Sequence, residues 1–477
     1  MSHDRFQTLV SLARSIRSGE TTPVALAELF LDRIASLDAK LGAFRLVLRD
    51  RALAQARAAQ TALQAGIDLG PLHGLPWSVK DLFDVKGYPT TAGTHLLADA
   101  IAQDDSTSVR RLEQAGMVLL GKNNTVQFAY GGMGINNDHG TPHNPWSPIP
   151  HVPGGSSSGT GVAVAAGLAP VGLGTDTGGS VRIPAALCGI VGLKTTLGRV
   201  SRAGVYPLSF SLDSVGVIAR CVEDAGLVYQ QIAGPDEADE TTLGVPPEDA
   251  LSELRAGVKG LRLAVVEEPF FDCVDPEIVR AVRDTVSVFE GLGAQVRPLA
   301  FPEAVEAQKL NIRGGVIAPE AYAVNRKFVE GRYDELDPVI RERMRNGATV
   351  SAPDYFEMTR RWAALRRDAR RSLADVDAFL VPTTMIPPLP SARLATDLTE
   401  YARRNVEYLR NNAIGNILGL CGLSVPCGFT GQGFPIGLLI YGKPFAERTI
   451  LRVGYAYERA TSWHERTPDL SWTDQNR

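Results

Sequence analysis

The chain has 477 residues, of which 44% are hydrophobic and 21% are charged, so it is a globular protein that can bury a large core. A formal net charge of −4 argues against a general nucleic-acid-binding surface, which would be basic. Five scattered cysteines suggest neither a disulfide framework nor a zinc site, and no stretch approaches the roughly 18 apolar residues of a membrane span. Since the N-terminus also lacks the apolar core of a signal peptide, we expect a cytoplasmic protein without membrane or nucleic-acid partners.

Residues 1–65 are predicted to form an N-terminal helical arm. Thr22 and Pro23 are typical of a helix cap and a first-turn proline, and one apolar stripe follows them. A second, alanine-rich helix is expected from Arg51 to Leu63. This arm is expected to pack on the main body of the protein or on a partner subunit.

Residues 66–477 are predicted to form a single domain, with a core at 72–225 and a C-terminal half at 226–477. Short strands and helices alternate through its first part, which indicates α/β architecture. The strands are expected at 75–85, 117–120, 169–174, 261–266, 423–429 and 436–440. Helices are expected at 106–115, 161–166, from 275 to about 293, over most of 301–375 and near the C-terminus. Residues 233–260 are acidic and contain two consecutive prolines, so they are predicted to be an excursion or linker.

Two glycine pairs each precede a serine within residues 153–199: Gly154-Gly155 before Ser156, and Gly178-Gly179 before Ser180. Glycine permits tight turns that aim several backbone N–H groups into one concavity, which suits an anion. A serine beside such a concavity is a candidate nucleophile with an oxyanion hole.

The same region resembles the amidase signature family. The resemblance is carried by GGSSSG at 154–159, GTDTGGSVRIPAALCG at 174–189 and GLKTTLGRVS at 192–201. It extends to GLPWSVKDLFDVKG, GKNNTVQFAYG, SLDSVG and LSVPCGF, and therefore covers most of the chain. It implies an α/β fold in which helices cover both faces of a large mixed sheet, a homodimer, and a hydrolase that needs neither a metal nor an organic cofactor.

A catalytic serine needs a base, and none of the seven histidines has a distinctive setting. Lys80 lies among apolar residues in PWSVKDLF, where burial would lower its pKa and favour the neutral amine. The resemblance places the family's catalytic lysine at Lys80 and its second catalytic serine at Ser156. It therefore implies that Ser180 attacks an amide carbonyl and that its proton passes through Ser156 to Lys80, which forms an acyl-enzyme.

Further residues are expected to support this site. Backbone N–H groups of Thr177, Gly178, Gly179 and Ser180 are predicted to form the oxyanion hole. The resemblance places substrate-binding residues at Ala129, Gly131, Gly132 and Met133, where small side chains would leave space for a compact apolar or aromatic acyl group. Three further residues are expected to give structural support: Ser157, Asp176 and Arg182.

Other interpretations remain open. Residues 155–159 fit the G-x-S-x-G elbow of α/β-hydrolases with Ser157 as nucleophile, but no convincing strand precedes them and only His464 follows. The amidase subunit of a tRNA-dependent amidotransferase shares the signature. That subunit typically has RQPA where this chain has RIPA at 182–185, and 203–217 also departs from its pattern, which favours a free-standing amidase of small-molecule amides. A non-catalytic protein of the same fold is disfavoured because Lys80, Ser156 and Ser180 are all present.

Overall fold

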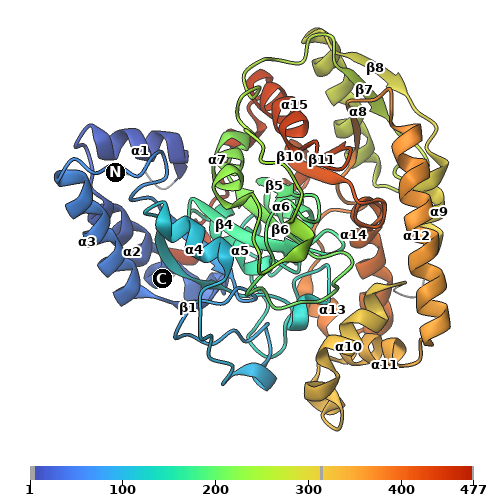
Figure 1. Cartoon of the computed structure of the whole chain (residues 1–477), viewed down its shortest axis with the longest axis horizontal. Helices are drawn as coiled ribbons and strands as arrows, with labels where there is room; N and C mark the ends of the chain where they lie inside the picture. Colours follow the sequence, from blue (N-terminus) through green and yellow to red (C-terminus); the bar gives the residue numbers. More distant parts are fainter. Residues whose placement is uncertain (1–5, 312–314, 475–477) are drawn as a thin grey trace.

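The computed structural model describes residues 6–311 and 315–474 and contains an 11-stranded sheet, ordered β1-β3-β2-β4-β6-β5-β10-β11-β9-β7-β8 (Figure 1). The strands are β1 (Phe44–Val47), β2 (Pro76–Lys80), β3 (Val118–Asn123), β4 (Val171–Asp176), β5 (Val191–Lys194), β6 (Ser214–Ala219), β7 (Arg262–Val265), β8 (Gln295–Pro298), β9 (Ala378–Pro382), β10 (Cys421–Phe429) and β11 (Pro435–Gly442).

The sheet is mixed, as the sequence predicts. Strands β3, β2 and β4 run parallel to one another, and so do β9, β7 and β8. The remaining neighbours are antiparallel. Parallel strands are normally covered on both faces, and the parallel strands β3, β2 and β4 are buried along their whole length.

Helices cover both faces of this sheet. The helices are α1 (Leu9–Arg17), α2 (Pro23–Leu41), α3 (Arg49–Gln64), α4 (Thr107–Gln114), α5 (Ser158–Ala165), α6 (Arg182–Cys188), α7 (Val222–Ile232), α8 (Pro276–Gly291), α9 (Pro302–Leu310), α10 (Ile317–Val329), α11 (Pro338–Ala348), α12 (Ala352–Ser372), α13 (Ser391–Thr396), α14 (Leu398–Leu418) and α15 (Glu447–Ala460). Successive residues of a strand face opposite sides. Gly422 of β10 faces Arg182 of α6, whereas Leu423 contacts Gly454 of α15. The fold is therefore the predicted helix–sheet–helix arrangement.

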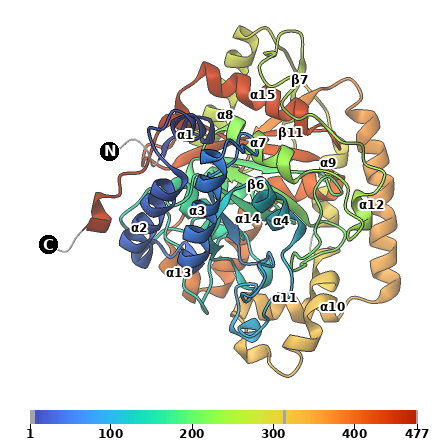
Figure 2. The same cartoon turned by 60° about the vertical axis from the view of Figure 1, so that its left-hand side comes forward.

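The first 65 residues contain helices α1, α2 and α3, which lie together at one end of the molecule (Figure 2). Thr22 caps α2 as expected, because its hydroxyl accepts a hydrogen bond from the Ala25 N–H at 3.1 Å. The prediction of an entirely helical arm was wrong, since β1 lies between α2 and α3. Its residues pair antiparallel with β3 and add an edge strand to the main sheet.

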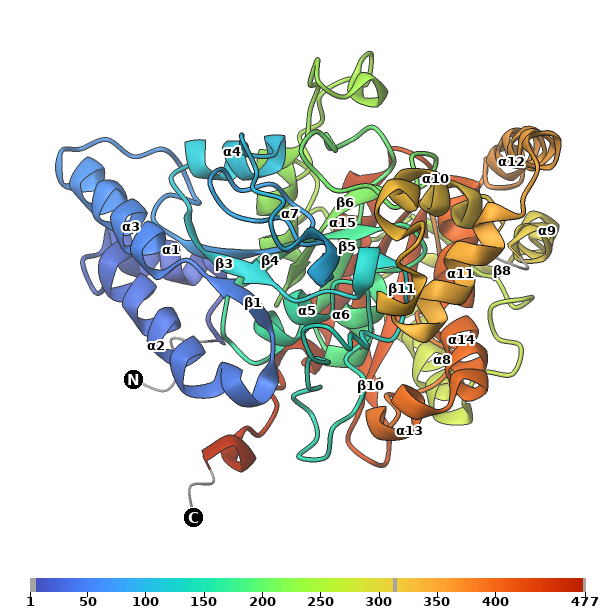
Figure 3. The ribbon, with the colours of Figure 1, turned by 90° about the horizontal axis from the view of Figure 1, so that it is seen from below.

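Most of the C-terminal predictions are confirmed. Helix α8 begins after Asp275, and β10 and β11 pair antiparallel across a short turn. Helices α9 to α12 occupy much of 301–375 and lie at the end of the molecule opposite α1 to α3 (Figures 1 and 3). Within 6–311 and 315–474, no helix is both long enough and apolar enough to cross a membrane.

Candidate active site

Lys80 is the last residue of β2, and its side chain is completely buried. Its Nζ donates hydrogen bonds to the Ser156 and Thr175 hydroxyls, each at 2.8 Å. Strand β4 carries Thr175 beside β2, since the two strands are parallel neighbours. Across the described chain, no carboxylate lies within 4 Å of this amine. The lysine therefore faces two neutral hydroxyls rather than a counter-ion.

Ser156 lies in the turn before α5, and Ser180 lies in the turn between β4 and α6. Both are buried, with 0% and 4% of their surface exposed. The Ser157 N–H donates to the Ser180 carbonyl oxygen at 3.2 Å, which joins the two turns. The Ser180 hydroxyl has no hydrogen-bond partner among the described residues. The structure thus joins Lys80 directly to Ser156 and holds Ser180 in the adjoining turn.

Burial dominates the ionisation of Lys80. It lowers the pKa of the amine from 10.5 to about 7, while the more distant carboxylates of Asp213 and Asp176 oppose the shift in part. A charged ammonium loses its hydrating waters on burial, and two hydroxyl partners make up for only part of that lost solvation. A substantial fraction of this lysine is therefore neutral near pH 7, which is the form that accepts a proton.

The turn that carries Ser180 is fixed by a buried ion pair between Asp176 and Arg182, at 2.8 Å. Oδ1 of Asp176 accepts from the Gly179 N–H at 2.9 Å, and Oδ2 accepts from the Val181 N–H at 3.1 Å. Burial alone would raise the pKa of Asp176, but the Arg182 guanidinium more than offsets this and holds that pKa below its usual range. Asp176 thereby ties both sides of the turn to one carboxylate.

We expect Asp176→Asn to lower the free energy of unfolding by about 3–5 kcal/mol, because it leaves the Arg182 charge buried without a counter-ion. Chemical denaturation measures this difference. Glu306→Gln is a suitable control because it removes one member of an exposed ion pair, with Lys309, and should leave the unfolding midpoint essentially unchanged. An unaltered midpoint in Asp176→Asn would contradict the anchoring role.

These bonds alter the expected oxyanion hole. The Gly179 N–H is not free, because it donates to Asp176 inside the turn. The N–H groups of Thr177, Gly178 and Ser180 have no acceptor among the described residues. The Thr177 hydroxyl donates to the buried carboxylate of Asp213 at 2.5 Å. Three of the four predicted donors therefore remain available to a ligand.

The predicted pocket residues lie in a strained segment. Phe128 and Ala129 have φ values of 51° and 57°, in the left-handed region that side chains disfavour. The Gly155 N–H donates to the Gly132 carbonyl at 2.8 Å, so this segment borders the turn that carries Ser156. Met133 is fully buried in an apolar cluster. The structure thus places Gly131 and Gly132 directly beside the turn that carries Ser156, with Ala129 and Met133 in the same segment.

The expectation that glycines leave space there for an acyl group is not met. A Cβ on Gly131 would lie 2.8 Å from the Tyr401 hydroxyl, and one on Gly132 would lie 2.9 Å from Leu409 Cγ. Asn405 accepts from the Gly132 N–H at 2.8 Å. The small residues therefore permit the close approach of α14.

Sequence reasoning missed several residues at this site. Thr175 stands only five positions before Ser180, but a hydroxyl on a strand carries no signal that it faces a lysine. One face of helix α14 also contacts the site, and the spacing of three or four positions between its residues is a signal that the sequence does contain. These residues are Tyr401, Asn405, Leu409, Asn412 and Asn416. Asn416 donates to Asp176 at 2.9 Å. One face of α14 therefore contacts both the turn that carries Ser180 and the segment that borders the Ser156 turn.

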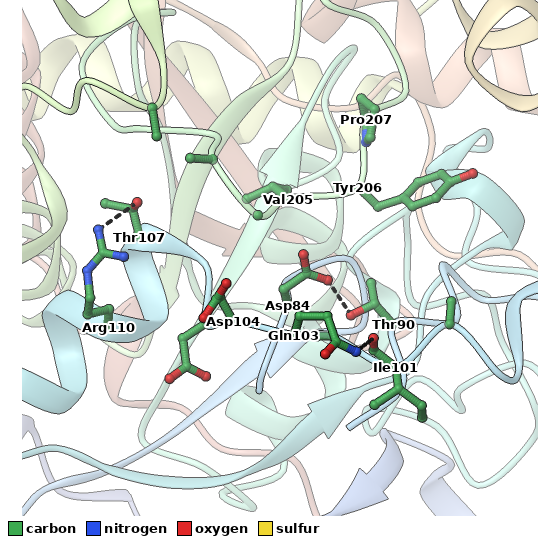
Figure 4. A pocket seen from close by; sticks show the side chains of 16 residues that line it. Asp84, Thr90, Ile101, Gln103, Asp104, Thr107, Arg110, Val205, Tyr206 and Pro207 are labelled. Carbon is green, nitrogen blue, oxygen red and sulfur yellow. Dashed lines mark hydrogen bonds between the residues drawn. The ribbon is translucent and has the colours of Figure 1, made fainter. Parts of the chain in front are cut away.

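A separate open pocket of about 660 Å³ lies between residues 100–107 and 203–207 (Figure 4). Thr90 donates to Asp84 at 2.7 Å on one side, and Arg110 donates to Thr107 at 3.1 Å on another. The candidate catalytic side chains do not line it.

A buried lysine bonded to one serine, with a second serine on the adjoining glycine turn, provides the groups that serine-dependent acyl transfer needs. The chain belongs to the amidase family, whose model, described as Amidase, matches residues 25–451. It is therefore an enzyme that hydrolyses amide C–N bonds.

Three relatives illustrate the range of this family. The chain is 40% identical to 2-amino-5-chloromuconic acid deaminase from Comamonas testosteroni, over 94% of this chain and 95% of that protein. It is 38% identical to the A subunit of glutamyl-tRNA(Gln) amidotransferase from Roseiflexus sp. (strain RS-1), over 97% of this chain and 98% of that protein. Native peptide amidase from Stenotrophomonas maltophilia has a similar structure, with a TM-score of 0.86, 30% identity and coverage of 98% and 99%.

Proposed function

We propose that this chain is a free-standing amidase that hydrolyses a carboxamide of a small molecule through an acyl-enzyme on Ser180. The observation that supports this most is the amine of Lys80, which is buried with hydroxyl partners and without a counter-ion. A neutral amine in this position can drive acyl transfer without histidine.

In this mechanism Ser180 Oγ attacks the amide carbonyl carbon, while its proton passes to Ser156 and the Ser156 proton passes to Lys80. The N–H groups of Gly178 and Ser180 stabilise the oxyanion, with Thr177 beside them. The leaving nitrogen then takes the proton back along the same route and departs as ammonia or an amine. Water then attacks the acyl-enzyme and gives its proton through Ser156 to Lys80. The proton returns to Ser180 Oγ as the acid is released.

A second candidate is the amidase subunit of a tRNA-dependent amidotransferase, which the similarity to the Roseiflexus protein favours. The free-standing enzyme is supported by the sequence RIPA at 182–185. It is also supported by the 40% identity to 2-amino-5-chloromuconic acid deaminase, which is as high as the identity to the amidotransferase subunit.

We further propose that the enzyme acts as a homodimer, which light scattering of the purified protein would test.

We expect the purified chain alone to release ammonia from simple carboxamides. An enzyme-coupled ammonia assay with aliphatic, aromatic and ureido amides measures this release. Release that requires added partner proteins and aminoacyl-tRNA would instead favour the amidotransferase role.

A further inference from the structure

Glu320, on α10, is a buried carboxylate that the proposed mechanism does not use. It is 7% exposed and accepts hydrogen bonds from the Ser209 hydroxyl, from the Ser211 hydroxyl and from the Ser211 N–H, the last at 3.1 Å. The Tyr355 hydroxyl of α12 donates to it at 2.6 Å. A buried carboxylate is costly unless several donors surround it, as they do here. Glu320 therefore joins two serines of one loop to α10 and α12.

These serines belong to residues 206–213, the connecting loop, which also contacts the segment that carries Lys80. The Tyr206 N–H donates to the carbonyl of Leu82, two positions after Lys80, at 2.7 Å. Tyr206 also lines the open pocket of Figure 4, and its hydroxyl donates to Asn325 of α10 at 2.8 Å. The connecting loop is therefore bonded to the lysine segment on one side and to α10 on the other.

The far end of the connecting loop meets the turn that carries Ser180. Asp213 is 8% exposed, and its Oδ2 accepts from the Leu208 and Ser209 N–H groups at 2.8 and 2.9 Å. Its Oδ1 accepts from the Thr177 hydroxyl at 2.5 Å. One carboxylate therefore binds both the connecting loop and the Ser180 turn, so a displacement of the loop displaces the partner of Thr177.

We propose that Glu320 is a positioning residue for hydrolysis at Ser180: it holds the connecting loop and, through Asp213 and Thr177, fixes the turn that presents the nucleophile and the oxyanion donors. This inference rests on the proposed function. Its effect passes along the hydrogen bonds of the loop, because the printed partners of Glu320 are the loop serines and Tyr355. A misplacement of reacting groups by about 1 Å can cost about 100-fold in rate, so a distant carboxylate can control kcat in this way.

Glu320→Gln tests the proposal, because it keeps the size of the side chain but replaces one acceptor oxygen with a donor. We expect kcat for amide hydrolysis, referred to the folded fraction measured by circular dichroism, to fall about tenfold or more while KM stays nearly unchanged. Glu330→Gln is the matched control. Glu330 follows the same helix and also accepts a tyrosine hydroxyl, from Tyr322, but it is exposed. It should retain kcat.

Thr177→Val shows whether the effect passes through the connecting loop, because valine lacks the hydroxyl that bonds to Asp213. In the Thr177→Val background, Glu320→Gln should lower kcat by less than about twofold, whereas independent effects would multiply. Ser209→Ala removes only one hydroxyl from Glu320 and should lower kcat in the same direction, so it serves if Glu320→Gln does not fold.

Three results overturn the proposal while the amidase function stands. They are an unchanged kcat in folded Glu320→Gln, an equal fall in Glu330→Gln, and fully multiplicative losses in the double variant with Thr177→Val. If Glu320→Gln does not fold, an unchanged kcat in Ser209→Ala has the same meaning.

If the wild-type protein hydrolyses no amide, the proposed function fails, and hydrogen–deuterium exchange then decides whether Glu320 fixes the turn. Glu320→Gln, or Ser209→Ala in its place, should speed exchange in peptides that cover 206–213 and 177–181, and Glu330→Gln should not. Faster exchange confined to 206–213, or no change in either segment, overturns the positioning role.

Discussion

Ser180→Ala is expected to reduce kcat for amide hydrolysis by at least about 10⁴-fold, because the variant lacks the oxygen that forms the acyl-enzyme. The fold should persist, since the neighbouring Asp176–Arg182 pair and the Ser157–Ser180 backbone bond do not involve the Ser180 hydroxyl. Steady-state ammonia release measures the loss, and circular dichroism verifies the fold.

Ser158→Ala provides a matched control for this substitution. Ser158 belongs to the same serine run, is fully buried, and its hydroxyl has no hydrogen-bond partner within the described residues. Alanine at the start of α5 should therefore preserve activity. Intact mass spectrometry after rapid quenching should detect an acyl adduct on the wild-type and Ser158→Ala proteins but not on Ser180→Ala. More than about 1% residual kcat in a pure Ser180→Ala preparation would contradict the assignment of the nucleophile.

The candidate catalytic residues were identified from the sequence because each one stands in a local pattern and the family resemblance assigns its role. Glycine pairs precede Ser156 and Ser180, and an apolar strand surrounds Lys80. Such patterns constrain the backbone near each residue, and the order of the sheet then brings β2 and β4 together. The alternation of short helices and strands likewise indicated an α/β fold, and the family resemblance implied that its sheet is mixed.

The substrate side of the site could not be predicted in the same way. Tyr401 meets Gly131 across 270 positions, and only the packing of α14 against the loop determines that contact. A glycine in a sequence does not reveal whether the space beside it is open or filled by a distant helix. The bond from the Gly179 N–H to Asp176 likewise depends on side-chain placement within the turn. Strand β1 was missed because four residues between two helices carry too short a pattern.

The pH dependence of activity follows from the burial of Lys80. The base must be neutral to accept a proton, and its pKa is lowered to about 7. Below that pH the protonated amine predominates in the folded enzyme, so kcat/KM should fall by about tenfold for each pH unit. Above it the amine is neutral and the rate should level off. A lysine with its ordinary pKa of 10.5 would instead give a rate that still rises at pH 9.

Lys80→Ala is expected to lower kcat/KM by about 10²–10⁴-fold and to remove the inflection near pH 7, because no general base remains beside Ser156.

The substitution leaves a cavity bordered by the Ser156 and Thr175 hydroxyls, into which a small amine can diffuse. Methylamine should therefore restore part of the activity, and the restored rate should rise with the fraction of free amine. Restoration in Lys80→Ala but not in Ser180→Ala would distinguish a missing base from general damage to the fold. A folded Lys80→Ala protein with full activity, or a wild-type profile that stays flat between about pH 5 and 9, would exclude a buried neutral amine as the proton acceptor.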